Sequence, residues 1–125
     1  MKIQYLIYLL LLSLNACSQQ ADNSYVNIDN KAFAEKMKDE QVIVLDVRTP
    51  DEFRQGHIPG AELIDYLAPD FSTRIASLDK NKTYLVYCAA GSRSAKASDI
   101  MTKNGFKNIY NLQGGYNAWN GEKEK

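Results

Sequence analysis

Cys88 is the residue of this 125-residue chain best placed to act as a nucleophile. It ends the apolar run TYLVYC and is followed by the small, polar loop AAGSR, after which a helical pattern begins near Ser94. A loop that enters a helix in this way directs backbone N–H groups, and the positive end of the helix, at the sulfur. Such donors lower the pKa of a thiol below its usual value of about 8.5, and the thiolate is the nucleophilic form. The competing interpretation is a small, buried apolar side chain without reactivity.

The five residues after this cysteine are predicted to form the substrate-binding loop. Ala89 and Ala90 leave space above the sulfur, and Gly91 permits a backbone conformation that other residues resist. Ser92 can donate a hydrogen bond to the sulfur site, and Arg93 adds a cation at the end of the loop. Two roles stay open for Arg93: it binds an anionic substrate, or it pairs with a carboxylate and braces the loop.

Short apolar runs alternate with helical patterns along the rest of the chain. Strands are predicted at residues 25–28, 42–47, 61–64, 83–88 and 108–112, and helices at 30–38, 51–55, 70–78, 94–104 and from 114 onward. This order predicts an α/β domain with a central, mainly parallel five-stranded sheet and helices on both faces. In such sheets ligands bind beyond the carboxyl ends of the strands, which is where Cys88 lies.

Three motifs occur in register within residues 24–121. CAAGSRS (88–94) resembles the C-x-x-G-x-R/T active-site loop of the rhodanese family of sulfurtransferases. VIVLDVRTPDEFRQGHIPGAELI (42–64) resembles the first signature of that family, and NLQGGYNAW (111–119) resembles its closing motif. The resemblance therefore covers one whole domain and implies the rhodanese fold for it.

The resemblance also implies an activity. Cys88 would be the catalytic residue, taking a sulfane sulfur from thiosulfate, a persulfide or a polysulfide and holding it as a cysteine persulfide. The sulfur would then pass to a thiophilic acceptor such as cyanide or a thiol. No metal and no organic cofactor is expected for this chemistry.

The resemblance assigns supporting roles to residues outside the loop. Asp46 and Arg48, which follow a strongly apolar run, are expected to be bracing ions, with Glu52 as the partner of Arg48. His57, the only histidine, is expected to be a turn residue in GHIPGA, since in this family the loop stabilises the thiolate. Ser94 can either donate a hydrogen bond toward the sulfur or cap the following helix.

Two alternatives are open beside the sulfurtransferase. The first is a non-catalytic rhodanese-like module that carries sulfur or docks a partner; retention of Cys88 argues against it. The second is a cysteine phosphatase or arsenate reductase. Those enzymes place five residues between the cysteine and the arginine, usually with a histidine before the cysteine. Here four residues separate Cys88 from Arg93, and Tyr87 precedes the cysteine.

The loop departs from the pattern of thiosulfate-preferring relatives. Those proteins often carry basic residues directly after the cysteine, where this chain has Ala89 and Ala90. A doubly charged donor would meet only Arg93 within the loop, with Lys96 one helical turn further along. The sequence therefore leaves the donor open between thiosulfate, used weakly, and a less charged persulfide or polysulfide.

The N-terminus predicts export. Residues 1–16 have a short positive start and an apolar run too short to span a bilayer, and are interpreted as a lipoprotein signal peptide. LNAC resembles the lipobox of bacterial lipoproteins, with Cys17 as the lipidated residue and residues 17–23 as a flexible tether. We therefore expect an extracytoplasmic, periplasm-facing protein anchored to a membrane. Ser18, in place of the aspartate that retains some lipoproteins at the inner membrane, favours the outer membrane.

Composition adds few constraints. The chain has 15 basic and 15 acidic residues and no long run of either charge, which gives no indication of nucleic-acid binding. With Cys17 lipidated, Cys88 has no disulfide partner within the chain, and an unpaired cysteine in an exported protein indicates a reactive thiol. Residues 122–125 are interpreted as a polar, solvated tail, and a monomer is expected.

Overall fold

The computed structural model describes residues 24–125. The predicted signal peptide (1–16), Cys17 and the tether (17–23) lie outside the described residues. Five strands alternate with five helices in the described part. They are β1 (Val26–Ile28), α1 (Asn30–Lys36), β2 (Ile43–Asp46), α2 (Pro50–Arg54), β3 (Glu62–Leu63), α3 (Phe71–Ala76), β4 (Thr83–Tyr87), α4 (Ser92–Lys103), β5 (Asn108–Leu112) and α5 (Gly115–Ala118).

The strands form one sheet in the order β1-β5-β4-β2-β3, and every neighbouring pair is parallel. The alternating α/β architecture expected from the sequence is thus confirmed, with a sheet that is wholly parallel. β4 lies at the centre, paired with β2 on one side and β5 on the other. Four of its five residues are buried, which is why this run reads as continuously apolar. The carboxyl end of this central strand leads directly to Cys88.

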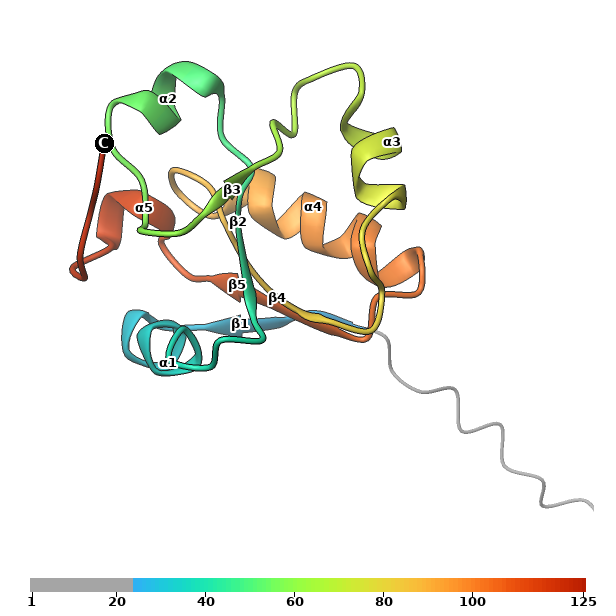
Figure 1. Cartoon of the computed structure of the whole chain (residues 1–125), viewed down its shortest axis with the longest axis horizontal. Helices are drawn as coiled ribbons and strands as arrows, with labels where there is room; N and C mark the ends of the chain where they lie inside the picture. The colour runs from blue at the N-terminus through green and yellow to red at the C-terminus, as the bar shows by residue number, and fades with distance from the viewer. Residues whose placement is uncertain (1–23) are drawn as a thin grey trace, which may run out of the picture.

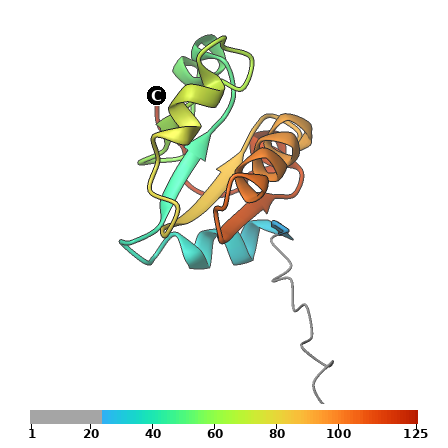
Figure 2. The same cartoon turned by 90° about the vertical axis from the view of Figure 1, so that its right-hand side faces the viewer.

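Helices cover both faces of the sheet (Figures 1 and 2). On one face Phe71 and Ile75 of α3 pack with Ala97 and Met101 of α4. On the other face Phe33 of α1 packs with Trp119, which ends α5. Burying both faces stabilises a parallel sheet, and it holds the carboxyl ends of the strands in fixed positions.

Capping residues in the sequence determine where α1 and α2 begin. Asp29 caps α1 by accepting a 2.8 Å hydrogen bond from the Ala32 N–H. Thr49 and Glu52 form a reciprocal capping box at the start of α2, with Pro50 in its first turn. α1 ends at Lys36, two residues before the predicted end.

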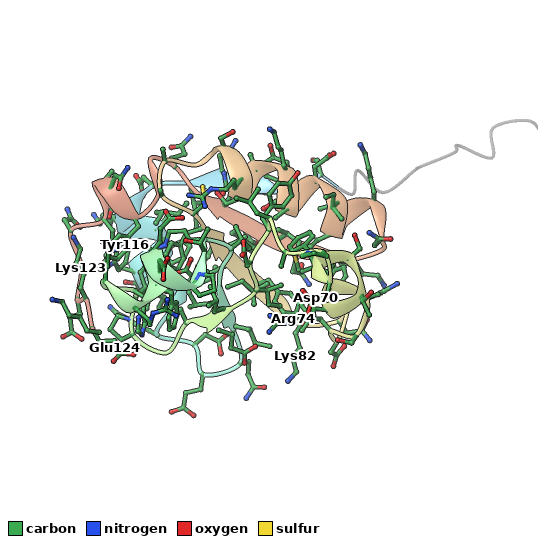
Figure 3. All side chains as sticks on the ribbon, turned by 90° about the horizontal axis from the view of Figure 1, so that it is seen from above. Asp70, Arg74, Lys82, Tyr116, Lys123 and Glu124 are labelled. Atoms are coloured by element: carbon green, nitrogen blue, oxygen red, sulfur yellow. The ribbon has the colours of Figure 1, made fainter. Side chains whose placement is uncertain are left out.

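The C-terminal residues 122–125, predicted to be a solvated tail, are exposed but docked on the domain. The backbone of Glu124 exchanges two hydrogen bonds with that of His57, at 2.8 and 2.9 Å. Lys123 lies over the ring of Tyr116, with Nζ 4.8 Å from the ring centroid. Figure 3 shows Tyr116, Lys123 and Glu124 on the same side of the molecule. This segment therefore closes over the loop that follows α2.

Within residues 24–125 the helices are too short and too polar for any of them to cross a membrane.

Candidate active site

Cys88 lies directly after β4, in the loop that joins this strand to α4 (Figure 1). Only 1 % of the Cys88 surface is exposed to solvent. Ala90 and Ser92 of the same loop are exposed, whereas Ser94 is buried. The Gly91 N–H donates to Sγ at 3.0 Å, and the Ser94 hydroxyl lies 3.3 Å from Sγ. One backbone N–H and one hydroxyl of this loop therefore face the sulfur.

Gly91 makes this loop geometry possible. Its φ of +106° lies in the left-handed region, where a side chain would be strained. Gly91 is the residue that precedes the first turn of α4, so the helix begins at Ser92, two residues earlier than predicted. Ser94 is therefore inside the first turn and does not cap the helix. Its hydroxyl is within reach of Sγ and of the Gly91 carbonyl, and an ionised sulfur is the stronger acceptor of its single proton.

These donors act on the ionisation of the thiol. Burial raises the pKa of Cys88, but hydrogen bonds from the Ser94 hydroxyl and from nearby backbone N–H groups outweigh this effect. The N–H groups belong to Ala90, Gly91 and Ser94. The pKa of Cys88 is consequently lower than that of an ordinary cysteine, which favours the nucleophilic thiolate.

Replacing Ser94 by alanine should raise the pKa of Cys88, because it removes a hydrogen bond to the thiolate, and a hydrogen bond to a charged group contributes roughly 1.5–3 kcal/mol. The pH dependence of Cys88 alkylation by iodoacetamide measures this shift. Ser98→Ala is the control, since Ser98 is equally buried on the same helix and is not among the groups that affect the pKa of Cys88. Equal pKa values in wild type and Ser94→Ala would show that the hydroxyl does not stabilise the thiolate.

The start of α5 holds the same loop from the other side. The Tyr116 N–H donates to the Cys88 carbonyl at 2.8 Å, and the Asn117 N–H donates to the Ala89 carbonyl at 2.9 Å. Gly115 lies so close that a Cβ there would be 2.5 Å from the Ala89 carbonyl oxygen. The loop carbonyls are thus bound to α5, which leaves the loop N–H groups directed at the sulfur.

The Arg93 guanidinium is paired with Glu52 and does not point freely into solvent. Two of its nitrogens donate to the two carboxylate oxygens of Glu52 at 2.8 and 3.0 Å. These hydrogen bonds, with others from Thr49, lower the pKa of Glu52 to about 2. The prediction that Glu52 pairs with Arg48 is therefore wrong. The Glu52 carboxylate on α2 is directed at the loop after β4, and Arg48 has another partner.

That partner is Asp46. Arg48 donates to both carboxylate oxygens of Asp46, with the shortest contact at 2.7 Å, and to the Gly56 carbonyl at 2.7 Å. Both side chains are buried, and the guanidinium lies over the rings of Tyr87 and Tyr116. The expected bracing role of Asp46 and Arg48 agrees with this geometry, since the ion pair joins β2 to the turn at Gly56.

Tyr87, the residue before Cys88, is hydrogen-bonded to this buried pair. Its hydroxyl donates to Asp46 at 2.6 Å and accepts from the Ile58 N–H at 3.0 Å. Burial is the largest effect on the Tyr87 hydroxyl, and it raises the pKa well above that of a free tyrosine. The hydroxyl therefore stays protonated and acts as a fixed structural link at the end of β4.

The sequence model of the rhodanese-like domain matches residues 29–122. The chain belongs to the rhodanese family. A sulfurtransferase of Allochromatium vinosum is 35 % identical over 94 residues, which cover 74 % of this chain and 85 % of the relative. The thiosulfate sulfurtransferase GlpE of Stutzerimonas stutzeri is 33 % identical over 87 residues, 69 % of this chain and 77 % of that protein.

Solved structures confirm the rhodanese fold. A rhodanese-like domain protein from Staphylococcus aureus superposes with a TM-score of 0.68 at 34 % identity, covering 78 % of this chain and 93 % of that one. A rhodanese-related protein from Thermoplasma volcanium gives a TM-score of 0.67 at 30 % identity, over 76 % and 90 % of the two chains. The fold expected from the three motifs is thus shared with known rhodanese domains.

His57 does not pair with Cys88 in this rhodanese domain. Its Nδ1 lies 3.0 Å from the Phe53 carbonyl, its Nε2 lies 3.2 Å from Glu124, and its ring stacks on Phe53. With both ring nitrogens engaged, the imidazole is a structural link between the GHIPGA turn and the C-terminal segment, as the turn assignment predicts. The thiolate is stabilised by amides and a hydroxyl, and not by a histidine.

The donors around Cys88 suit an anion. N–H and O–H groups surround the sulfur, and these groups bind negative charge and not metal cations. Among residues 24–125, no three His, Cys, Asp or Glu side chains gather in a way that could hold a metal ion.

The contacts that α5 makes with the loop after β4 could not be predicted from the sequence. Gly114 and Gly115 both have positive φ, at 75° and 60°. A pair of glycines at a helix start is itself a signal of an unusual backbone, but the sequence does not say which carbonyls approach it.

Proposed function

We propose that this rhodanese domain is a sulfurtransferase that carries sulfane sulfur as a persulfide on Cys88. The donor is thiosulfate, a persulfide or a polysulfide, and the acceptor is a thiophile such as cyanide or a thiol. The observation that carries the proposal is the set of N–H and O–H donors around Sγ, which stabilises a sulfur anion in place. Relatives named as sulfurtransferases support the same reaction class.

Both half-reactions need only this one thiolate. In the first, Cys88 attacks the outer sulfur of the donor, a new S–S bond forms, and the donor S–S bond breaks. The bonding pair leaves with the rest of the donor, as sulfite from thiosulfate or as a thiolate from a persulfide. In the second, the acceptor attacks the terminal persulfide sulfur, and the Cys88 thiolate leaves. The same N–H groups donate hydrogen bonds to the negatively charged sulfur, first in the persulfide and then in the regenerated thiolate.

Intact mass separates this activity from a binding-only role. The purified full chain, treated with a sulfur donor, should gain the mass of one sulfur atom, and a reductant should remove it. Subsequent addition of cyanide should release thiocyanate. An unchanged mass with every donor would mean that the domain serves only to dock a partner, and a stable gain without release would mean a carrier without turnover.

The phosphatase alternative is less compatible with this geometry. A phosphate-binding loop needs its arginine free to hold the oxyanion, but Arg93 is bound through two nitrogens to Glu52. We expect no hydrolysis of p-nitrophenyl phosphate above the rate of a Cys88→Ser variant.

For the location, we propose a lipoprotein anchored through Cys17 and facing the periplasm, with residues 1–16 removed. Cys17→Ala should release the protein from the membrane fraction or leave it with an uncleaved leader, because the sulfur is the atom that receives the lipid. Fractionation and metabolic labelling with a tagged fatty acid measure both effects. Cleaved, membrane-bound protein in this variant would show that another anchor holds it.

A further inference from the structure

The two arginines near the sulfur are each paired with a carboxylate. Arg93 is the cation of the loop itself, and its bidentate partner Glu52 is ionised at neutral pH. Arg48, beneath the loop, is paired with Asp46 inside the protein. Lys96, one helical turn beyond Arg93, is exposed, so water and salt screen its charge. Among residues 24–125, the neighbourhood of Cys88 thus contains no unpaired cation that is partly buried.

This balance matters because the nucleophile is itself an anion. A thiosulfate dianion that approaches the Cys88 thiolate is repelled by it, and a free arginine at the loop would offset that repulsion. In the structure Glu52 holds that arginine, and the pair is only partly exposed, with side-chain exposures of 23 % for Arg93 and 33 % for Glu52. Coulomb interactions at such a half-buried position are stronger than in bulk water.

We infer that Glu52 determines which sulfur donor the domain accepts: by neutralising Arg93 it favours small organic hydropersulfides over dianionic donors such as thiosulfate. This inference rests on the proposed function and specifies its donor. Glu52 contacts neither the sulfur nor, in this arrangement, the donor; it acts through Arg93 and is a residue that sets specificity.

The favoured step is balanced without any further reagent. The Cys88 thiolate attacks the terminal sulfur of a hydropersulfide, R–S–SH, forming the Cys88 S–S bond. The donor S–S bond breaks and its electron pair leaves on R–S⁻. The proton of the terminal sulfur stays on the new persulfide and is then lost to solvent. When R–S–SH reacts in its protonated form, thiolate and donor carry a single negative charge between them, compared with two when the persulfide is ionised and three for thiolate and thiosulfate.

Glu52→Gln tests the inference, because it keeps the size of the side chain and one acceptor oxygen for Thr49 and Arg93, and it removes the negative charge. The second-order rate constant for loading Cys88 is measured by quenched intact-mass spectrometry with two donors, thiosulfate and cysteine hydropersulfide. We expect the variant to load about tenfold faster from thiosulfate and to change less than about twofold with the hydropersulfide. Asp51→Asn is the matched control, since it removes the same charge from the neighbouring residue of α2, where Asp51 pairs with exposed Arg54. It should change neither rate.

The outcomes separate this inference from the proposed function. If wild type loads from neither donor, the proposed function is wrong and the inference fails with it. If wild type loads but Glu52→Gln changes both rates equally, or slows both, Glu52 only braces the loop and the inference alone is overturned.

Wild type offers a second test that does not depend on the folding of a variant. Raising ionic strength should accelerate loading from thiosulfate, since salt screens repulsion, and should leave loading from the hydropersulfide nearly unchanged. A slower reaction with thiosulfate at high salt would show that the site attracts the dianion and would overturn the inference.

Discussion

Cys88→Ser should abolish sulfur transfer, with thiocyanate formation falling by about a thousandfold or more. A serine hydroxyl is not ionised at neutral pH and cannot form the S–S bond on which both half-reactions depend. The donors that stabilise the Cys88 thiolate, led by the Ser94 hydroxyl, would have no anion to act on. The measurement is thiocyanate release from the purified full chain after addition of thiosulfate or a hydropersulfide and then cyanide.

The serine variant should still fold, because its oxygen can accept the same hydrogen bonds from the loop. Thermal unfolding of the two proteins should therefore agree within a few degrees. Cys17→Ala provides the matched control, because it removes the chain's other cysteine and should retain transfer. Substantial thiocyanate formation by folded Cys88→Ser would show that another group carries the sulfur, and the proposed mechanism would be wrong.

Much of the fold could be predicted because its signals are local. The strand that became β4 reads as strongly apolar since both faces of the sheet are covered, and the same holds for β2. The capping box of Thr49 and Glu52 is a local signal of the same kind, and α2 begins at Pro50, one residue before the predicted helix at 51–55. Cys88 could be recognised as a candidate reactive residue for the same reason, since a cysteine between a strand and a glycine-containing helix start implies a particular backbone geometry.

Pairings between distant side chains could not be predicted in this way. Glu52 lies four residues after Arg48, which makes a local ion pair plausible, but α2 carries its carboxylate to Arg93, 41 residues further along the chain. Arg48 instead folds back on Asp46, two residues away. Such choices depend on where the elements lie in three dimensions. The docking of Glu124 on His57 is of the same kind, since nothing in a short polar C-terminus indicates which turn it reaches.

Gly115→Ala should be the most damaging change outside the nucleophile. The new Cβ would lie 2.5 Å from the Ala89 carbonyl oxygen and 2.6 Å from the Cys88 carbonyl oxygen, and neither backbone atom can move without moving the loop. The φ of +60° adds strain of roughly 1–2 kcal/mol for any residue with a side chain. Together these effects should lower the free energy of unfolding by roughly 3 kcal/mol. Sulfur transfer should fall at least about tenfold, because displaced carbonyls carry the sulfur-binding N–H groups away with them.

Gly60→Ala separates steric clash from backbone strain. Gly60 has a similar φ of +77°, but nothing lies within 4 Å of a Cβ built there. This control should lose only about 1 kcal/mol and should keep full sulfur transfer. Urea unfolding gives both stabilities, and the pH dependence of Cys88 alkylation reports on the loop, with a raised pKa expected in Gly115→Ala alone. If the two variants lose equal stability and Cys88 ionises normally in both, α5 does not hold the loop in its thiolate-binding geometry.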